Sequence, residues 1–237
     1  MNKDLGNRYD LVIRGGTVVC GLDLVDADVA VKDGLIMALG RDLPVGLEEL
    51  DATGRLVLPG GVDVHTHIEQ ISATGISTAD DWSSATRSAA LGGTTTVLAF
   101  AAQHRGLNLR DVVEDYSQRA QAGAIIDYGF HLMVCNPDDQ TVSHDLPQLI
   151  DEGHRSVKVF MTYDSLALSD EHLLDVMEVA RKHGALVCVH AENHDAIMYM
   201  TEKLLDAGLG QTKYHAWCKP ALVEREATTR VIMLAEL

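Results

Sequence analysis

The chain has 237 residues, of which 46% are hydrophobic and 23% are charged, as in an ordinary soluble globular protein. Its formal net charge of −16 argues against nucleic acid and anionic membranes as partners. The polar start lacks the apolar region of a signal peptide, and no C-x-x-C pair is formed by Cys20, Cys135, Cys188 and Cys218. We therefore expect a cytoplasmic protein with reduced thiols.

The first part of the chain predicts a small antiparallel β-module that ends near Leu58. Alternating apolar and polar residues over positions 10–19 and 27–40 are typical of half-buried strands. The pairs Gly15-Gly16 and Asp33-Gly34 lie between strand-like runs, and each pair is typical of a hairpin turn. We therefore assign residues 1–58 to one module.

From residue 59 onward, predicted strands alternate with predicted helices. Apolar runs rich in β-branched residues predict buried strands at residues 61–67, 94–100, 127–134, 156–163 and 185–192. Helical patterns that end near a glycine cover residues 78–92, 108–123 and 169–184. This alternation indicates a parallel α/β sheet or barrel. Only five strands are found, whereas a (β/α)8 barrel needs eight and about 250 residues, so residues 59–237 predict a partial barrel.

The last predicted helix begins near Pro220 and runs to the final residue. No Gly, Asn or Pro marks its end. An apolar stripe without a predicted partner is formed by Ile232, Met233, Leu234 and Leu237. We therefore expect the chain to be cut off within a longer protein.

Four side chains that can bind metal ions lie at or near the ends of predicted strands. His65 and His67 end the first strand on one face, and imidazole is the commonest metal ligand in proteins. Lys158 lies inside the fourth strand, where a buried ammonium is costly unless it is paired or uncharged. His190 ends the fifth strand. Catalytic groups of a barrel come from the carboxyl ends of different strands, although Lys158 paired with an acid and a packed His190 remain alternatives.

His131 and Asp63 have interpretations other than direct metal binding. His131 lies within the third strand, where core packing is favoured over metal binding. Asp63 shares a strand face with His65 and His67, so it either orients an imidazole or bonds to the backbone.

The motifs PGGVDVHTH, GGTTTV, KVFMTY and VHAEN occur in this order and spacing, and together they resemble hydantoinases and dihydropyrimidinases of the amidohydrolase superfamily. The resemblance runs from about Tyr9 to the C-terminus and includes the segment YHAWCKPALVEREA. It implies a β-sandwich assembled from both chain ends and a barrel that holds two divalent metal ions, expected to be zinc. Residues 1–58 would form the N-terminal part of the sandwich and residues 59–237 the first part of the barrel.

The resemblance also implies a set of site residues. His65 and His67 would bind one metal ion, and His190 would bind the second. Lys158, carbamylated by carbon dioxide, would bridge both ions. Carbamylation is physically coherent, because it turns a buried cation into an anionic oxygen ligand. Tyr163 would donate a hydrogen bond to the oxyanion formed when a metal-bridging hydroxide attacks, although a packed strand-end aromatic is the alternative.

The implied reaction opens a cyclic amide, a hydantoin or dihydropyrimidine ring, to an N-carbamoyl amino acid. The partner would be this small molecule, with neither nucleic acid nor membrane, and the full-length protein would form a homo-oligomer, a tetramer by resemblance. The family also needs a metal-binding His on its sixth strand and an Asp on its eighth. Both would lie beyond Leu237, so this segment alone is expected to be inactive.

Two other functions remain open at this stage. A catalytically incomplete fragment or a non-enzymatic scaffold is the first, although scaffolds of this family tend to lose metal ligands and every ligand position reached here is retained. A dihydroorotase or an allantoinase is the second, since both share the His-x-His strand. We expect these enzymes to lack the tyrosine of KVFMTY, and turnover of dihydroorotate but not hydantoin would favour them.

Overall fold

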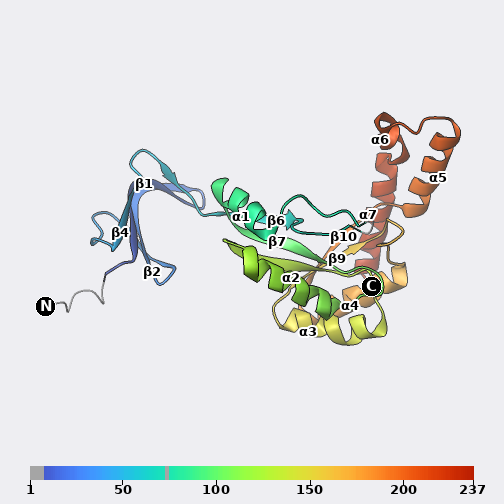
Figure 1. Cartoon of the computed structure of the whole chain (residues 1–237), viewed down its shortest axis with the longest axis horizontal. Coiled ribbons are helices and arrows are strands. Elements are labelled where there is room, and N and C mark those ends of the chain that lie inside the picture. The colour runs from blue at the N-terminus through green and yellow to red at the C-terminus, as the bar shows by residue number, and fades with distance from the viewer. Residues whose placement is uncertain (1–7, 73–74) are drawn as a thin grey trace. The chain divides into compact units, whose positions relative to one another are not determined.

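A computed structural model describes residues 8–72 and 75–237, and the chain divides into two compact units between Gly60 and Gly61 (Figure 1). Each unit is built around its own five-stranded sheet.

The N-terminal unit is a mixed sheet. Its strands are β1 (Leu11–Cys20), β2 (Asp23–Lys32), β3 (Leu35–Gly40), β4 (Glu48–Asp51) and β5 (Leu56–Val57). The strand order is β3-β2-β1-β4, and β5 also pairs with β1. Strand β1 runs antiparallel to β2 but parallel to β4 and β5, so the expectation of a purely antiparallel module is wrong. The reason is that the chain crosses from β3 to the far side of β1 over residues 41–47 instead of turning back in a hairpin.

The two glycine-containing pairs of this unit behave differently. Asp33 and Gly34 form the turn between β2 and β3, with φ angles of 53° and 75°, as predicted. Gly15 and Gly16 do not form a turn, and that prediction is wrong. They lie inside β1, where the register with β2 shifts as in a β-bulge, and Gly15 has a φ of 65°. A Cβ at Gly16 would lie 2.6 Å from a methyl group of Val57, so glycine there permits close strand packing.

The second unit contains the five predicted parallel strands. They are β6 (Gly61–Thr66), β7 (Thr94–Ala102), β8 (Asp127–Met133), β9 (Ser156–Phe160) and β10 (Leu186–His190). Their order in the sheet is β10-β9-β8-β7-β6, and every neighbouring pair is parallel. Sequential parallel strands with helical crossovers are the repeat of a (β/α)8 barrel, so the predicted partial barrel is confirmed.

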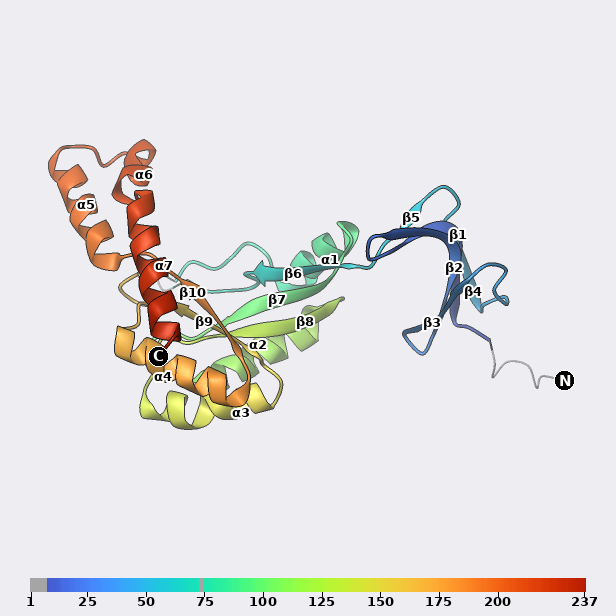
Figure 2. The same ribbon diagram turned by 180° about the vertical axis from the view of Figure 1, so that it is seen from behind.

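Helices connect the strands and cover one face of the sheet (Figures 1 and 2). The crossover helices are α1 (Trp82–Leu91), α2 (Leu109–Gly123), α3 (Leu146–Asp151) and α4 (Asp170–His183). The sequence marks three of them clearly, because Asp81, Asn108 and Ser169 cap α1, α2 and α4. Gly184, with a φ of 74°, ends α4. Helix α3 follows a π-helical turn at Thr141–Asp145, and the sequence pattern did not predict it.

Three helices follow β10: α5 (His194–Asp206), α6 (His215–Cys218) and α7 (Ala221–Ala235). Helix α5 packs against α6 and α7, and α7 begins after Pro220 as predicted. No helix in the part of the chain that the structure describes is long and apolar enough to cross a membrane.

The apolar core of the second unit lies between the sheet and the crossover helices. Leu109 of α2 and Leu149 of α3 pack against Leu132 of β8 and Val159 of β9, all nearly inaccessible to solvent. Side chains alternate along a strand, so the residues between these core positions point to the opposite face. That face carries His131, Lys158 and His190.

Candidate metal centre

The strand register places the expected ligands of β9 and β10 on one face. Lys158 pairs with Cys188, and Phe160 pairs with His190 one step nearer the carboxyl ends. Paired residues of neighbouring strands project their side chains to the same side. Lys158 and His190 therefore belong to successive layers of the same sheet face.

His65 and His67 surround the ring of Phe100 at the end of β6. The ring centroids of His65 and His67 lie 5.6 Å apart, and those of Phe100 lie 4.8 Å and 4.7 Å from them. Phe100 reaches this point because β7 is the direct neighbour of β6 in the sheet. The His-x-His pair is therefore held by ring packing against the next strand.

The electrostatic surroundings keep His65 uncharged. Its pKa lies below the ordinary 6.5, first because partial burial disfavours the charged imidazolium and then because the basic groups His67, Lys158 and His131 interact unfavourably with that charged form. Asp63 opposes this shift only weakly. A neutral imidazole is the form that binds a metal ion.

The hydrogen bonds of two imidazoles leave one nitrogen free on each. His67 Nδ1 lies 2.6 Å from Gln70 Oε1, and His190 Nε2 lies 3.0 Å from Glu192 Oε2. Both oxygens can only accept, so these ring nitrogens carry the protons. His67 Nε2 and His190 Nδ1 then keep their lone pairs for a metal ion.

Lys158 is buried without a carboxylate partner. The residue is 8% exposed, and its Nζ lies 4.9 Å from the centroid of the Phe160 ring. No carboxylate forms an ion pair with it anywhere in residues 8–72 and 75–237, which contradicts the alternative of a structural ion pair. Burial lowers the pKa of its ammonium, only partly offset by Cys188. A buried amine with a lowered pKa is readily deprotonated, as a lysine that reacts must be.

His190 and Tyr163 form a second cluster around Phe160. The ring of His190 stacks on Phe160 at 5.7 Å and lies 5.2 Å from the ring of Tyr163. Glu192 bonds to His190 and forms an ion pair of 2.7 Å with Lys219. Phe160 therefore contacts Lys158, His190 and Tyr163.

Tyr163 occupies an unusual backbone position just after β9. Its φ of 72° lies in the left-handed region, which costs a non-glycine residue about 1–3 kcal/mol and persists only when the surroundings enforce it. The N–H groups of Leu166 and Ala167 donate to its carbonyl. His194 bonds to Thr162 at 3.3 Å and to Asp164 at 3.0 Å, so the residues on both sides are held. Tyr163 is 41% exposed, and its ring contacts the rings of Phe160 and His190.

His131 and Asp63 do not join the site. Both ring nitrogens of the buried His131 are occupied, by Ser156 Oγ and by the carbonyl oxygen of Val64, each at 2.7 Å. His131 is thus a core residue, as the sequence predicts. Asp63 accepts a hydrogen bond from the backbone N–H of His65 at 3.0 Å, which is the backbone role left open above.

The structure brings the expected residues together only in part. His65 and His67 pack around Phe100, while Lys158, His190 and Tyr163 lie around Phe160. In the described part of the chain, no three His, Cys, Asp or Glu side chains lie close enough to hold a metal ion by themselves.

The sequence analysis did not identify the residues that contact the two histidines or their partners: Gln70, Glu192 and Lys219. Glu192 could have been found, because it follows His190 by two residues and a carboxylate beside a ligand histidine commonly orients the ring. Lys219 lies 27 residues from Glu192, and no local pattern connects the two.

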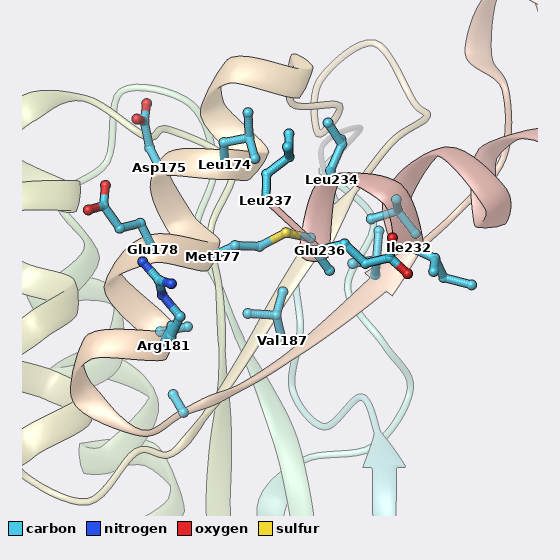
Figure 3. Close-up of a pocket in the computed structure, with 15 residues that line it drawn as sticks. Leu174, Asp175, Met177, Glu178, Arg181, Val187, Ile232, Leu234, Glu236 and Leu237 are labelled. Carbon is cyan, nitrogen blue, oxygen red and sulfur yellow. The ribbon is translucent and has the colours of Figure 1, made fainter.

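An apolar groove beside α7 is not part of this site (Figure 3). Met177 of α4, Val187 of β10 and Leu234 of α7 line it. Because side chains alternate along a strand, Val187 and His190 point to opposite faces of β10. The groove therefore lies behind the strand that presents His190.

Comparisons with known proteins agree with this geometry. A model of the amidohydrolase family matches residues 56–232. A D-hydantoinase of Geobacillus stearothermophilus is 43% identical over 229 residues, covering 95% of this chain and 48% of that protein. A dihydropyrimidinase of Rattus norvegicus is 38% identical over 232 residues, covering 95% and 44%. A solved structure of a D-hydantoinase has a TM-score of 0.92 at 42% identity, covering 96% of this chain and 50% of the other.

Because the family match spans most of the chain, the chain belongs to the amidohydrolase family. Its similarity to D-hydantoinases and a dihydropyrimidinase confirms the resemblance carried by the four motifs. The chain spans about half the length of the curated relatives it matches.

Proposed function

We propose that this chain supplies part of the active site of a metal-dependent cyclic amidohydrolase. The reaction opens a hydantoin or dihydropyrimidine ring to an N-carbamoyl amino acid. The observation that carries the proposal is the buried Lys158, which has no carboxylate partner among the described residues, has a lowered pKa and occupies the same face of the sheet as His190. The names of the relatives, D-hydantoinase and dihydropyrimidinase, support the choice of substrate class.

The residues present fit a pair of divalent metal ions. His65 and His67 would hold one ion, and His190 the other, since His67 and His190 each keep one ring nitrogen outside these hydrogen bonds. Imidazole and oxygen ligands suit zinc, which is the metal we propose. When bound, such ions acidify water and polarise a carbonyl group.

Lys158 is proposed to be carbamylated. Its neutral amine nitrogen would bond to the carbon of carbon dioxide and release one proton, which leaves a carbamate with one negative charge. The lowered pKa favours the neutral amine that this reaction requires. The product is an anionic oxygen ligand, so a costly buried cation becomes a group that attracts metal ions.

Tyr163 is proposed to be the catalytic residue that this chain contributes. Its hydroxyl would donate a hydrogen bond to the oxygen of the ring carbonyl, on which negative charge develops. The enforced backbone conformation and the adjacent His190 support this role, because a donor must be fixed before the reaction to be effective.

The intact protein is proposed to act in the cytoplasm as a homo-oligomer on this small-molecule substrate. The four cysteines are free, which agrees with a reducing compartment. Dihydroorotase and allantoinase activity remain the runners-up.

The experiment is to purify the full-length protein after growth with zinc, and to measure metal content and turnover of hydantoin, dihydrouracil and dihydroorotate. We expect close to two divalent ions per chain and hydrolysis of hydantoin or dihydrouracil. Absence of bound metal would overturn the metal centre, and turnover of dihydroorotate alone would replace the substrate assignment.

A further inference from the structure

Arg119 of α2 holds the segment that follows the His-x-His pair. Its Nη1 donates a hydrogen bond to the carbonyl oxygen of Glu69, two residues after His67, and lies 4.0 Å from the Glu69 carboxylate. Its Nη2 donates to Asp115 Oδ2 at 2.6 Å, and its guanidinium carbon lies 4.2 Å from the centroid of the Tyr116 ring. Asp115 and Tyr116 belong to the same helix, so α2 fixes the guanidinium and the guanidinium fixes Glu69.

Glu69 is the point at which the chain turns. Its φ of 48° lies in the left-handed region, which is unfavourable for a non-glycine residue and persists only where the surroundings enforce it. The backbone N–H of Glu69 donates to the carbonyl oxygen of Asp80 at 3.1 Å, and its carboxylate accepts from the backbone N–H of Trp82 at 3.4 Å. Arg119 binds the carbonyl oxygen of Glu69. The left-handed conformation is therefore held by three contacts, and Arg119 supplies the charged donor among them.

The turn at Glu69 directs Gln70 back to His67. Gln70 Oε1 lies 2.6 Å from His67 Nδ1, while Ile68, between the two residues, is buried in the core. The backbone of Gln70 bonds to Thr78, whose N–H donates to the Gln70 carbonyl at 2.9 Å and whose hydroxyl accepts from the Gln70 N–H at 3.0 Å. A side chain with as many rotamers as glutamine holds an imidazole well only when its own backbone is fixed. The bond from Gln70 to His67 therefore depends on the turn at Glu69.

One atom of Arg119 shows that its position is costly. Its Nε is buried and has no hydrogen-bond partner among the described residues. A buried donor without a partner destabilises a protein, and such a group in a native structure needs an explanation. The hold on Glu69 supplies one, because both terminal nitrogens of the guanidinium are used while Nε is left unpaired.

We propose that Arg119 is a positioning residue that fixes the tautomer and the orientation of His67 through Glu69 and Gln70. This inference rests on the proposed function, in which His67 binds a metal ion. While Nδ1 carries the proton toward Gln70, the lone pair of Nε2 is kept for the ion. Arg119 acts through the backbone of this segment.

The same helix offers a matched control. Arg110 of α2 also forms an ion pair, with Glu152 at 3.0 Å, and it donates to Gln148 of α3 at 3.1 Å. Arg110→Met and Arg119→Met each remove one paired guanidinium from α2. Only Arg119→Met should affect His67.

The first test reads the tautomer and needs no activity. In metal-free full-length protein labelled with ¹⁵N at histidine, long-range ¹H–¹⁵N spectra at mildly alkaline pH, where imidazoles are neutral, show which ring nitrogen carries the proton. His67→Asn identifies the signals of His67. The wild-type protein and Arg110→Met should show His67 protonated at Nδ1, whereas Arg119→Met should show a mixture of the two tautomers. A folded Arg119→Met protein that keeps the single Nδ1–H tautomer would overturn the inference.

The second test is a double-mutant cycle on the metal affinity of the full-length protein, measured by competition between zinc binding and a chelating dye. Arg119→Met is expected to weaken zinc binding between about three- and tenfold, because a residue that acts through Gln70 costs no more than Gln70 itself. In a Gln70→Ala background, Arg119→Met should cause almost no further loss. An equal loss in both backgrounds would show that Arg119 supports the fold without acting through Gln70, and the inference would fail.

Arg119→Lys covers the case in which Arg119→Met does not fold. Lysine keeps the positive charge beside Tyr116 but lacks the planar fork that reaches Asp115 and the Glu69 carbonyl together. The same mixture of tautomers should appear to a smaller extent, and an unchanged tautomer in this variant would contradict the inference. If the tautomer changes as expected but the wild-type protein binds no zinc, the proposed function fails instead.

Discussion

The two edges of the parallel sheet hold the side chains proposed to bind metal ions in different ways. At the β6 edge, His65 and His67 pack on the ring of Phe100, and partial burial is the main cause of the lowered pKa of His65. At the β10 edge, His190 belongs to a network of opposite charges with Glu192 and Lys219. The first arrangement disfavours protonation of His65, and the second fixes which nitrogen of His190 carries the proton. Lys158 lies on β9, the strand next to the β10 edge.

Removing Lys158 should have the largest effect, because both edges depend on it. Lys158→Ala is expected to abolish the metal pair in the full-length protein and to lower turnover by at least about 10³-fold, since about 4 kcal/mol of transition-state stabilisation would be lost. Elemental analysis and hydantoin hydrolysis measure this, and short carboxylic acids should restore part of the activity. Lys182→Ala, on the exposed face of α4, is the control. A fully active Lys158→Ala protein would refute the bridging role.

Tyr163→Phe tests the catalytic part of the β10 edge. The variant should lower kcat by about 10² to 10³ and leave KM nearly unchanged, because a hydrogen bond to a developing oxyanion acts mainly in the transition state. Steady-state kinetics on the full-length protein give the answer. A change in KM without a change in kcat would make Tyr163 a substrate-binding residue.

Glu192→Gln tests the charge network. The amide keeps the size of the side chain but removes the charge shared by His190 and Lys219. We expect metal affinity to fall between about 10- and 100-fold, the usual cost of losing a group that orients a ligand histidine. Competition with a chelating dye measures the affinity. An unchanged affinity would show that the carboxylate does not orient His190.

Gln70→Ala removes the hydrogen-bond partner of His67 at the β6 edge, as Glu192→Gln alters the partner of His190 at the β10 edge. The loss of affinity should be at or below about tenfold, because the ring of His67 is also held by stacking on Phe100. The same dye competition applies. If Gln70→Ala cost more than Glu192→Gln, the distinction between ring packing and a charge network would be wrong.

The smallest expected effect concerns the protonation of His65. Its folded pKa is lowered, so the ring is uncharged at neutral pH, and protons compete with a metal ion only below the ordinary value of 6.5. Lys158→Met removes one of the positive charges and should raise this pKa, although burial, the largest cause, keeps it below the ordinary value. NMR titration of the metal-free protein measures the shift. Lys182→Met should cause none, and a lowered pKa in Lys158→Met would contradict the assigned cause.

The sequence predicted the second unit better than the first. The five parallel strands follow from apolar runs bounded by capped helices, and these signals are local. In the N-terminal unit, the glycine pair at Gly15-Gly16 looks like a turn in sequence. Whether such a pair forms a turn or a bulge depends on which strands pair on either side, and β4 and β5 pair with β1 from more than thirty residues away.

The same distinction between local sequence patterns and contacts of distant segments applies to the candidate site. The sequence by itself placed His65, His67, Lys158 and His190 on the correct strands and strand ends, because strand periodicity determines which face a residue occupies. Only the tertiary structure decided that Lys158 has no carboxylate partner, that both nitrogens of His131 are used, and that Lys219 reaches Tyr163. These outcomes depend on contacts between segments that the chain brings together from far apart, and the free energy of burying or pairing a charge is set by those contacts alone.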